Sequence, residues 1–154
     1  DDELYVTSGL GNIDIIQKAN KYVDEEKGFL APVDFINMLG NTTSYYVASS
    51  LGLKGKNTFC ISDNFTFINT LIALYSSINI SKLEAILCSI DLVTTPSEVL
   101  KRLLDVKEDI ELSSAVNYQK FSLSKDGALG YIEFDTKCYS RQEVQEIINK
   151  NNTK

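Results

Sequence analysis

The sequence predicts an α/β fold in which a five-stranded mixed sheet carries helices on both of its faces. Two kinds of segment alternate along most of the chain, and such alternation is typical of this class. The first kind has the composition of buried strands and occurs at residues 4–8, 57–62 and 83–92. The second kind has apolar residues at helical spacing and occurs at residues 13–26, 33–50 and 65–78. With 154 residues, of which 44% are hydrophobic, the chain is expected to form one domain over residues 1–154.

The N-terminal part is predicted to be one strand followed by two helical segments. The strand "LYVTS" ends at Gly9, and Asn12 or Asp14 is placed to cap the helix that follows. Pro32 suits the first turn of the next helix, because a proline lacks the N–H that would be unpaired there. The sequence "GNTT" at 40–43 predicts an interruption of this second helical segment.

The middle of the chain is predicted to form a strand, a buried helix and a second strand. Residues 57–62 are the first strand, and the helix at 65–78 is apolar on nearly every side. Because a soluble protein does not leave such a helix in water, we expect it to be buried. Residues 83–92 read as a strand of a parallel sheet. Asp91 closes this strand, where an aspartate usually serves turn chemistry.

The C-terminal part is predicted to contain a short helix, a hairpin and a last helix. Pro96 opens the short helix, which extends to about Leu104. The hairpin joins "SAVNYQKFSLS" to "ALGYIEFD" through an Asp-Gly turn at 126–127. This second hairpin segment would be the fifth strand of the sheet. The last helix is amphipathic and covers residues 141–150.

The composition excludes several classes of function. A net charge of −6 argues against a nucleic-acid interface, which requires a basic face. No apolar run is long enough to span a bilayer, so we expect no membrane span. The chain contains no histidine, which rules out imidazole-based metal sites and serine or cysteine catalysis that uses a histidine base. Its three cysteines are widely spaced and suggest reduced thiols in the cytoplasm. We therefore expect no metal and no cofactor.

One stretch, Phe29 to Asp91, shows an order of signals that is informative as a whole. The signals are Pro32, Phe35, Gly40-Asn41 and "LGLKG" at 51–55, followed by a strand, an apolar helix and a strand ending in "SID". This order resembles the N-terminal half of the β-ketoacyl synthases of the thiolase-like superfamily, especially the divergent ketosynthase-like group of polyene and fatty-acid clusters. The resemblance implies that the sheet is equivalent to one half of a thiolase-like fold.

The same resemblance points to the position where an active ketosynthase carries its cysteine. Counting without gaps from Gly55, this position is occupied by Asn64. A carboxamide is not a usable nucleophile, so no thioester is expected here. Chain-length factors, the partners of ketosynthases, carry an amide at this position, usually glutamine. Two interpretations stay open: Asn64 contacts a substrate or partner, or it caps the buried helix together with Ser62 and Asp63.

The resemblance implies a catalytically inactive ketosynthase-like subunit, comparable to a chain-length factor in polyketide or fatty-acid biosynthesis. Its partner would be a ketosynthase-like protein, in a homodimer or heterodimer, and an acyl carrier protein would be reached through that partner. In ketosynthases, the strand before the nucleophile pairs across the dimer axis. Thr58, Phe59, Cys60 and Ile61 are therefore the candidate residues for a dimer strand, which should lie at an edge of the sheet.

Two other functions are considered. A cysteine-dependent acyl-transfer enzyme would need Cys60, Cys88 or Cys138 as its nucleophile. The first two are predicted to lie within strands, where no helix dipole acidifies a thiol, and the third lacks a base. The other alternative is a small α/β protein-interaction domain that is unrelated to lipid synthesis. Catalysis is thus less expected than a binding role.

Overall fold

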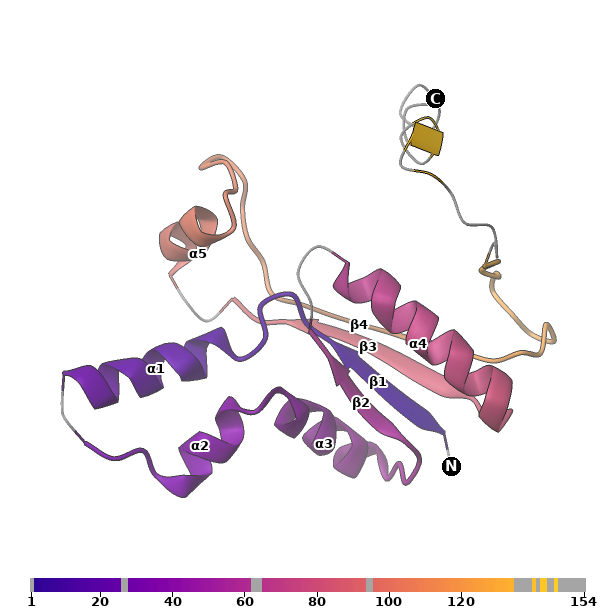
Figure 1. Ribbon diagram of the computed structural model, residues 1–154, viewed down its shortest axis with the longest axis horizontal. Helices are drawn as coiled ribbons and strands as arrows, with labels where there is room; N and C mark the ends of the chain where they lie inside the picture. Colours follow the sequence, from indigo (N-terminus) through magenta and orange to yellow (C-terminus); the bar gives the residue numbers. More distant parts are fainter. Residues whose placement is uncertain are drawn as a thin grey trace. The chain divides into compact units, whose positions relative to one another are not determined.

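The computed structural model describes residues 2–25, 28–61, 65–93, 96–134, 140, 142–143 and 146. The chain divides into two compact units, Asp1–Leu123 and Ser124–Lys154. The first unit contains the sheet and the helices that cover it. Its elements, in chain order, are β1 (Glu3–Thr7), α1 (Ile13–Asp24), α2 (Pro32–Met38), α3 (Gly40–Leu51), β2 (Asn57–Cys60), α4 (Thr66–Ser81), β3 (Ala85–Asp91), α5 (Ser97–Leu103) and β4 (Ala115–Phe121) (Figure 1).

The described residues form a mixed four-stranded sheet in the order β2-β1-β3-β4. β1 is parallel to both of its neighbours, so that Tyr5 lies opposite Thr58 of β2 and Leu87 of β3. β4 is antiparallel to β3. The prediction of a mixed α/β sheet is confirmed, and β2 lies at an edge of the sheet as expected.

One face of the sheet packs against α3. Leu4 and Val6 of β1 form a buried cluster with Cys88 of β3 and Ala48 of α3. Phe59 of β2 borders this cluster. Its ring comes so close to Gly40 that a Cβ there would lie 2.5 Å from a ring carbon. The first residue of α3 is therefore a glycine because the helix begins directly against β2.

The opposite face of the sheet packs against α4. Tyr5, which alternates with Leu4 and Val6 along β1, is completely buried. Lys56, just before β2, donates hydrogen bonds from Nζ to Tyr5 Oη at 3.2 Å and to Ser77 Oγ on α4 at 3.3 Å. Since neighbouring side chains of a strand point to opposite faces, α3 and α4 cover the two faces of the sheet.

The expectation that α4 is buried all round is wrong for the described part of the molecule. One face of the helix is buried, through Thr66, Thr70, Leu71, Leu74 and Ile78. The other apolar side chains, among them Ile68 and Ile72, stay about half exposed. The sheet covers only the face of α4 that packs against it, so the opposite face of the helix stays exposed.

The fifth strand and its hairpin were also predicted wrongly. The turn forms, with Gly127 at φ +69° and a hydrogen bond from Ala128 N to Lys125 O of 3.3 Å. Residues 128–134, however, are not a strand. β4 is itself exposed over nearly its whole length, so a further strand would find no apolar layer to cover. The predicted last helix at 141–150 lies mostly outside the described residues.

Two smaller differences concern the ends of elements. The second helical segment breaks at Leu39, one residue before the predicted "GNTT" interruption, because Leu39 has the extended backbone that separates α2 from α3. β2 ends at Cys60 instead of residue 62. In the described part of the chain, no helix is long and apolar enough to cross a membrane, and no three potential metal ligands come together.

A carboxylate is buried between β1 and α4. Glu3 is only 3% exposed, and its Oε2 accepts a hydrogen bond from Tyr5 Oη at 3.0 Å. Burial by itself raises the pKa of Glu3, but hydrogen bonds from Ser77, Ser81 and Tyr5 and the charge of Lys56 together lower this pKa below its usual value. The ionised form is thus the one that the folded state prefers.

This preference predicts a pH-dependent contribution to stability. Because the pKa of Glu3 is lower in the folded than in the unfolded chain, its contribution is complete above the unfolded value of about 4.5 and is lost as the pH falls through the folded value. We expect Glu3→Gln to make the free energy of unfolding fall less steeply between pH 6 and pH 3 than in the unmodified protein. Urea denaturation at several pH values measures this slope.

The matched control is Glu25→Gln, which removes a carboxylate whose side chain is 65% exposed beside Lys21. This variant should keep the slope of the unmodified protein. Equal slopes for Glu3→Gln and the unmodified protein would contradict the assignment.

Candidate functional site

The carboxyl ends of β1, β2 and β3 meet at one edge of the sheet, which we call the carboxyl edge. Because the three strands are parallel, their last residues Thr7, Cys60 and Asp91 lie on this same side (Figure 1). The chain leaves β1 toward β2 on one side and later reaches β3 on the other. Ligand sites of α/β sheets lie where the connections diverge in this way. The carboxyl edge is therefore the first place to look for a site.

Asp91 organises the turn between β1 and α1. Its Oδ1 accepts hydrogen bonds from Ser8 Oγ at 2.9 Å, from Gly9 N at 2.9 Å and from Leu10 N at 3.0 Å. Ser8 Oγ in turn accepts a hydrogen bond from Gly11 N at 2.7 Å. The prediction of turn chemistry for Asp91 is thus confirmed, but the turn belongs to a segment about eighty residues earlier in the chain.

Gly11 brings the end of β2 into the same site. Its φ of +59° is the left-handed conformation that favours glycine, and a Cβ at this position would lie 2.6 Å from Ile61 Cδ1. Ser8 N also donates to Cys60 O, at 3.4 Å. The turn after β1 and the residue after β2 therefore pack directly on each other.

Asn12 connects this turn to the two helices α2 and α3. It begins α1, but its side chain makes no capping hydrogen bond, contrary to the prediction. Instead, its Nδ2 donates to Asn37 O at 3.0 Å and to Leu39 O at 3.1 Å. Asn37 lies at the end of α2, where the last carbonyls lack partners within the helix, and Leu39 O also accepts a hydrogen bond from Thr42 N of α3 at 3.1 Å. Through these two hydrogen bonds, Asn12 holds the break between α2 and α3 close to the carboxyl edge.

The predicted nucleophile-equivalent position lies beyond what the structure describes. Asn64 and its predicted cap neighbours Ser62 and Asp63 belong to the residues outside the described ranges. The described residues on either side are Ile61, after β2, and Phe65, before α4. Both roles of Asn64, a helix cap or a functional amide, stay predictions.

Cys60 and Cys88 are the cysteines of the described part, and both are free. Cys88 is buried in β3, and this burial raises the pKa of its thiol, which keeps it protonated at neutral pH. Cys60 is partly buried at the end of β2. Cys138 lies outside the described residues. A thiolate mechanism therefore gains no support from Cys88.

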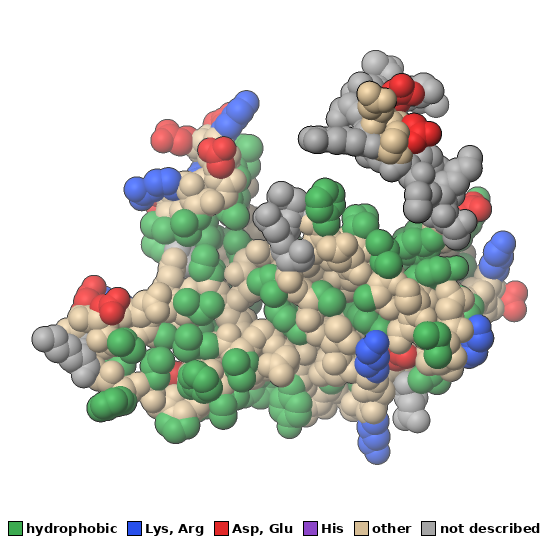
Figure 2. All heavy atoms as spheres, viewed as in Figure 1, with side chains coloured by type: hydrophobic (Ala, Val, Ile, Leu, Met, Phe, Trp, Pro, Cys, Tyr) green, Lys and Arg blue, Asp and Glu red, His purple; other side chains and the backbone are tan. Residues whose placement is uncertain are grey.

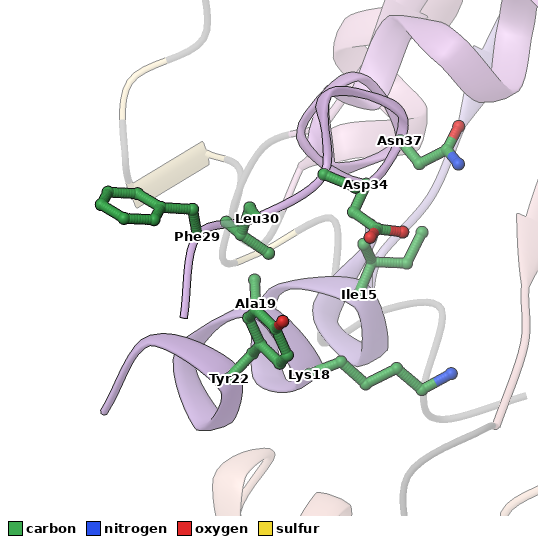
Figure 3. A pocket seen from close by; sticks show the side chains of 9 residues that line it. Ile15, Lys18, Ala19, Tyr22, Phe29, Leu30, Asp34 and Asn37 are labelled. Carbon is green, nitrogen blue, oxygen red and sulfur yellow. The ribbon is translucent and has the colours of Figure 1, made fainter. Parts of the chain in front are cut away.

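A cavity lies between α1 and α2. This cavity of about 410 Å³ is lined by Ile15, Lys18, Ala19, Tyr22, Phe29, Leu30, Ala31, Asp34 and Asn37 (Figure 3). Asp34 and Ile15 point toward each other across it, whereas Phe29 points away. Phe29 is 96% exposed. Most of the lining residues are apolar, and Lys18, Asp34 and Asn37 supply its charged and amide groups.

Comparison with known proteins gives a likeness in structure but none in sequence. Neither a protein-family model nor a curated protein matches the chain. Among solved structures, it is similar to a chain of the ketosynthase ApeO in complex with its chain length factor ApeC, from Xenorhabdus doucetiae. The TM-score is 0.64 at 7% sequence identity, and the match covers 79% of this chain and 50% of the other. The likeness shows a shared fold, and this chain spans about half the length of its neighbour.

The hydrogen bonds of Asp91 lead to a prediction for stability. Asp91→Ala leaves two backbone N–H groups and one hydroxyl without their acceptor, and we expect it to lower the free energy of unfolding by about 2–3 kcal/mol. Asp91→Asn keeps the Oδ1 acceptor, so its cost should be about 1 kcal/mol. Urea denaturation at neutral pH measures both.

The control for this series is Asp109→Ala, which removes an exposed carboxylate from the loop after α5. It should change the free energy of unfolding by less than about 0.5 kcal/mol. If Asp91→Ala behaves like this control, Asp91 does not hold the turn.

The close approach of Gly11 and Ile61 leads to a second prediction. Gly52 has a similar φ of +66°, but nothing lies within 4 Å of the position of its Cβ. Gly52→Ala should therefore cost about 1 kcal/mol for the backbone alone. Gly11→Ala should cost about 1–3 kcal/mol more, because its methyl group also displaces Ile61.

The same denaturation experiment tests the cause of the difference. Adding Ile61→Ala to the Gly11→Ala variant should recover part of the lost stability, since it opens space for the methyl group. Equal losses for Gly11→Ala and Gly52→Ala would show that the contact with Ile61 is unimportant.

Proposed function

We propose that this protein is a catalytically inactive ketosynthase-like subunit that pairs with a complete ketosynthase, in the manner of a chain-length factor. The observation that carries the proposal is the open edge strand β2, which ends next to the position of the missing nucleophile. The shared fold with a chain of a ketosynthase–chain length factor complex supports it. The biosynthetic setting would be polyketide or fatty-acid synthesis.

The chemistry of the chain supports a role without catalysis. An ungapped count places Asn64 where the resemblance requires a cysteine, and a carboxamide cannot form a thioester. No histidine is present to stabilise an enolate or to act as a base. Among the described cysteines, Cys88 is buried and protonated at neutral pH. A subunit with these residues would shape a partner's site instead of performing the reaction.

The backbone of β2 is suited to pair with a strand of another chain. The carbonyls of Lys56 and Cys60 accept hydrogen bonds from β1. In a parallel pair, alternate residues bond to one neighbour, so the N–H and C=O groups of Asn57 and Phe59 point away from β1. β2 is the outer strand on this side of the described sheet. An edge of this kind adds a strand from a partner through main-chain hydrogen bonds.

The charge of the chain suggests where an acyl carrier protein would bind. The net charge is −6, and carrier proteins are themselves acidic, so the two would repel each other at long range. We therefore infer that the carrier protein docks on the ketosynthase partner. The alternative, an interaction domain without a role in lipid synthesis, is separated from this proposal by the identity of the partner.

The experiment measures binding to a complete ketosynthase. Asn57→Pro removes an N–H that points to the open edge while leaving the bonds to β1, and we expect it to weaken binding at least tenfold. Size-exclusion chromatography of the mixture detects the complex, and calorimetry gives its affinity. Circular dichroism confirms that the variant is folded.

A matched pair of lysine substitutions locates the interface. Asn57 and Asn117 are both exposed, on the two opposite edge strands β2 and β4. Asn57→Lys should weaken the complex, because a lysine at an edge opposes strand addition, and Asn117→Lys should not. A protein that ignores the ketosynthase, or binds it equally well in all variants, would contradict the proposal.

A further inference from the structure

The cavity between α1 and α2 is built from one face of each helix. The lining residues of α1, from Ile15 to Tyr22, follow one another at helical spacing and so share a face. Asp34 and Asn37 of α2 are three residues apart and line the other wall. The volume of about 410 Å³ lies in the range of small-molecule sites, and mostly apolar walls with a few polar groups are typical of such sites.

Hydrogen bonds hold the cavity in shape at both of its ends. At one end, Asn12 Nδ2 donates to the carbonyls of Asn37 and Leu39. At the other end, Gly28 N donates to Tyr22 O at 3.3 Å. The Tyr22 ring packs so closely on Gly28 that a Cβ at this position would have no room. The cavity is therefore maintained by the fold on both sides.

The polar groups of the cavity lie apart from its aromatic wall. Figure 3 shows the side chains of Asp34 and Asn37 and the ammonium group of Lys18 at one end. The side chains of Tyr22 and Leu30 lie at the other end. Figure 2 shows hydrophobic side chains gathered over α1 and α2 around this place. A ligand that fits this arrangement has a polar head and an apolar body.

The polar end holds two opposite charges that are not paired with each other. Among the ion pairs of the described residues, none joins Lys18 to Asp34, and none of the hydrogen bonds found there ends on the Asp34 carboxylate. Both side chains are exposed, so a ligand can reach them from solvent.

These two charges specify the head of the ligand. An ammonium group would pair with the Asp34 carboxylate, and a carboxylate would pair with the Lys18 ammonium. A plain hydrocarbon chain would fill the apolar end but leave both charges unpaired. We propose that the cavity between α1 and α2 binds a free α-amino acid with an apolar side chain, whose ammonium faces Asp34 and whose carboxylate faces Lys18.

The openness of the cavity and the size of the ligand predict weak binding. A molecule as small as an amino acid has few atoms that can contribute to affinity, so we expect a dissociation constant on the order of 1 mM. The cavity is lined by α1, α2 and the segment before α2, and no residue of β2 takes part in it. Binding of the amino acid therefore does not depend on the proposed pairing with a ketosynthase.

Titration of the isotope-labelled full chain with L-phenylalanine, followed by NMR, tests the proposal. We expect the backbone amide signals of residues 15–22 and 29–37 to shift and to saturate. Two analogues separate the charges of the head, because phenethylamine lacks the carboxylate and hydrocinnamate lacks the ammonium. Each analogue should bind about three- to fivefold more weakly than L-phenylalanine, since each loses one exposed ion pair.

Two substitutions assign each charge to its side chain. Asp34→Asn should weaken the binding of L-phenylalanine and phenethylamine about three- to fivefold without weakening that of hydrocinnamate. Lys18→Gln should weaken L-phenylalanine and hydrocinnamate by a similar factor and spare phenethylamine. The matched control is Asp24→Asn, which removes an exposed carboxylate of α1 outside the cavity and should leave all three affinities unchanged. The same spectra show that each variant is folded.

Three results would each overturn the proposal. The first is the absence of shifts around the cavity up to about 20 mM L-phenylalanine, well above the expected dissociation constant. The second is equal affinity for the three compounds, and the third is an Asp34→Asn variant that binds L-phenylalanine like the unmodified protein. None of them concerns the binding of a ketosynthase at β2, because the Asn57 variants test that surface separately.

Discussion

The structure depends on the burial of β1 at the centre of the sheet. All five residues from Glu3 to Thr7 are buried, and the strand is paired on both sides, with β2 and with β3. Its alternating side chains contact α3 on one face and α4 on the other. A strand that is buried on both faces must also have its backbone N–H and C=O groups paired, and β1 meets both conditions. The positions of the other strands and of both covering helices follow from this arrangement.

The carboxyl edge shows how the same arrangement creates a site. Parallel pairing brings the ends of three strands together, and Asp91 uses this proximity to fix the turn after β1. Gly11 then allows Ile61, the residue after β2, to pack on that turn. The residue at position 64 is an asparagine, and its carboxamide cannot attack a thioester.

The sequence predicted the elements better than it predicted their surroundings. Periodicity located β1, α1, β3 and α5 to within a few residues, because the local pattern follows directly from one buried face. It failed for residues 128–134, where the Asp-Gly turn formed but the exposed β4 offered no layer for a further strand. The contact between Ser8 and Asp91 could not be predicted by spacing, since it joins residues 83 positions apart. The apolar pattern of α4 led to the expectation of burial on every side, but the structure buries only the face of the helix that packs against the sheet.

Among the described residues, the β2 edge and the outer face of α4 are two surfaces that differ in chemistry and therefore in specificity. The β2 edge offers backbone hydrogen bonds, which have a fixed direction and register but accept many side chains. The outer face of α4 offers apolar side chains without charge, which favour contact but select a partner mainly by shape. In the function proposed above, a strand from a ketosynthase would pair with the β2 edge. Because the sheet separates in-plane pairing from packing on its faces, a strand added at β2 would leave the outer face of α4 uncovered.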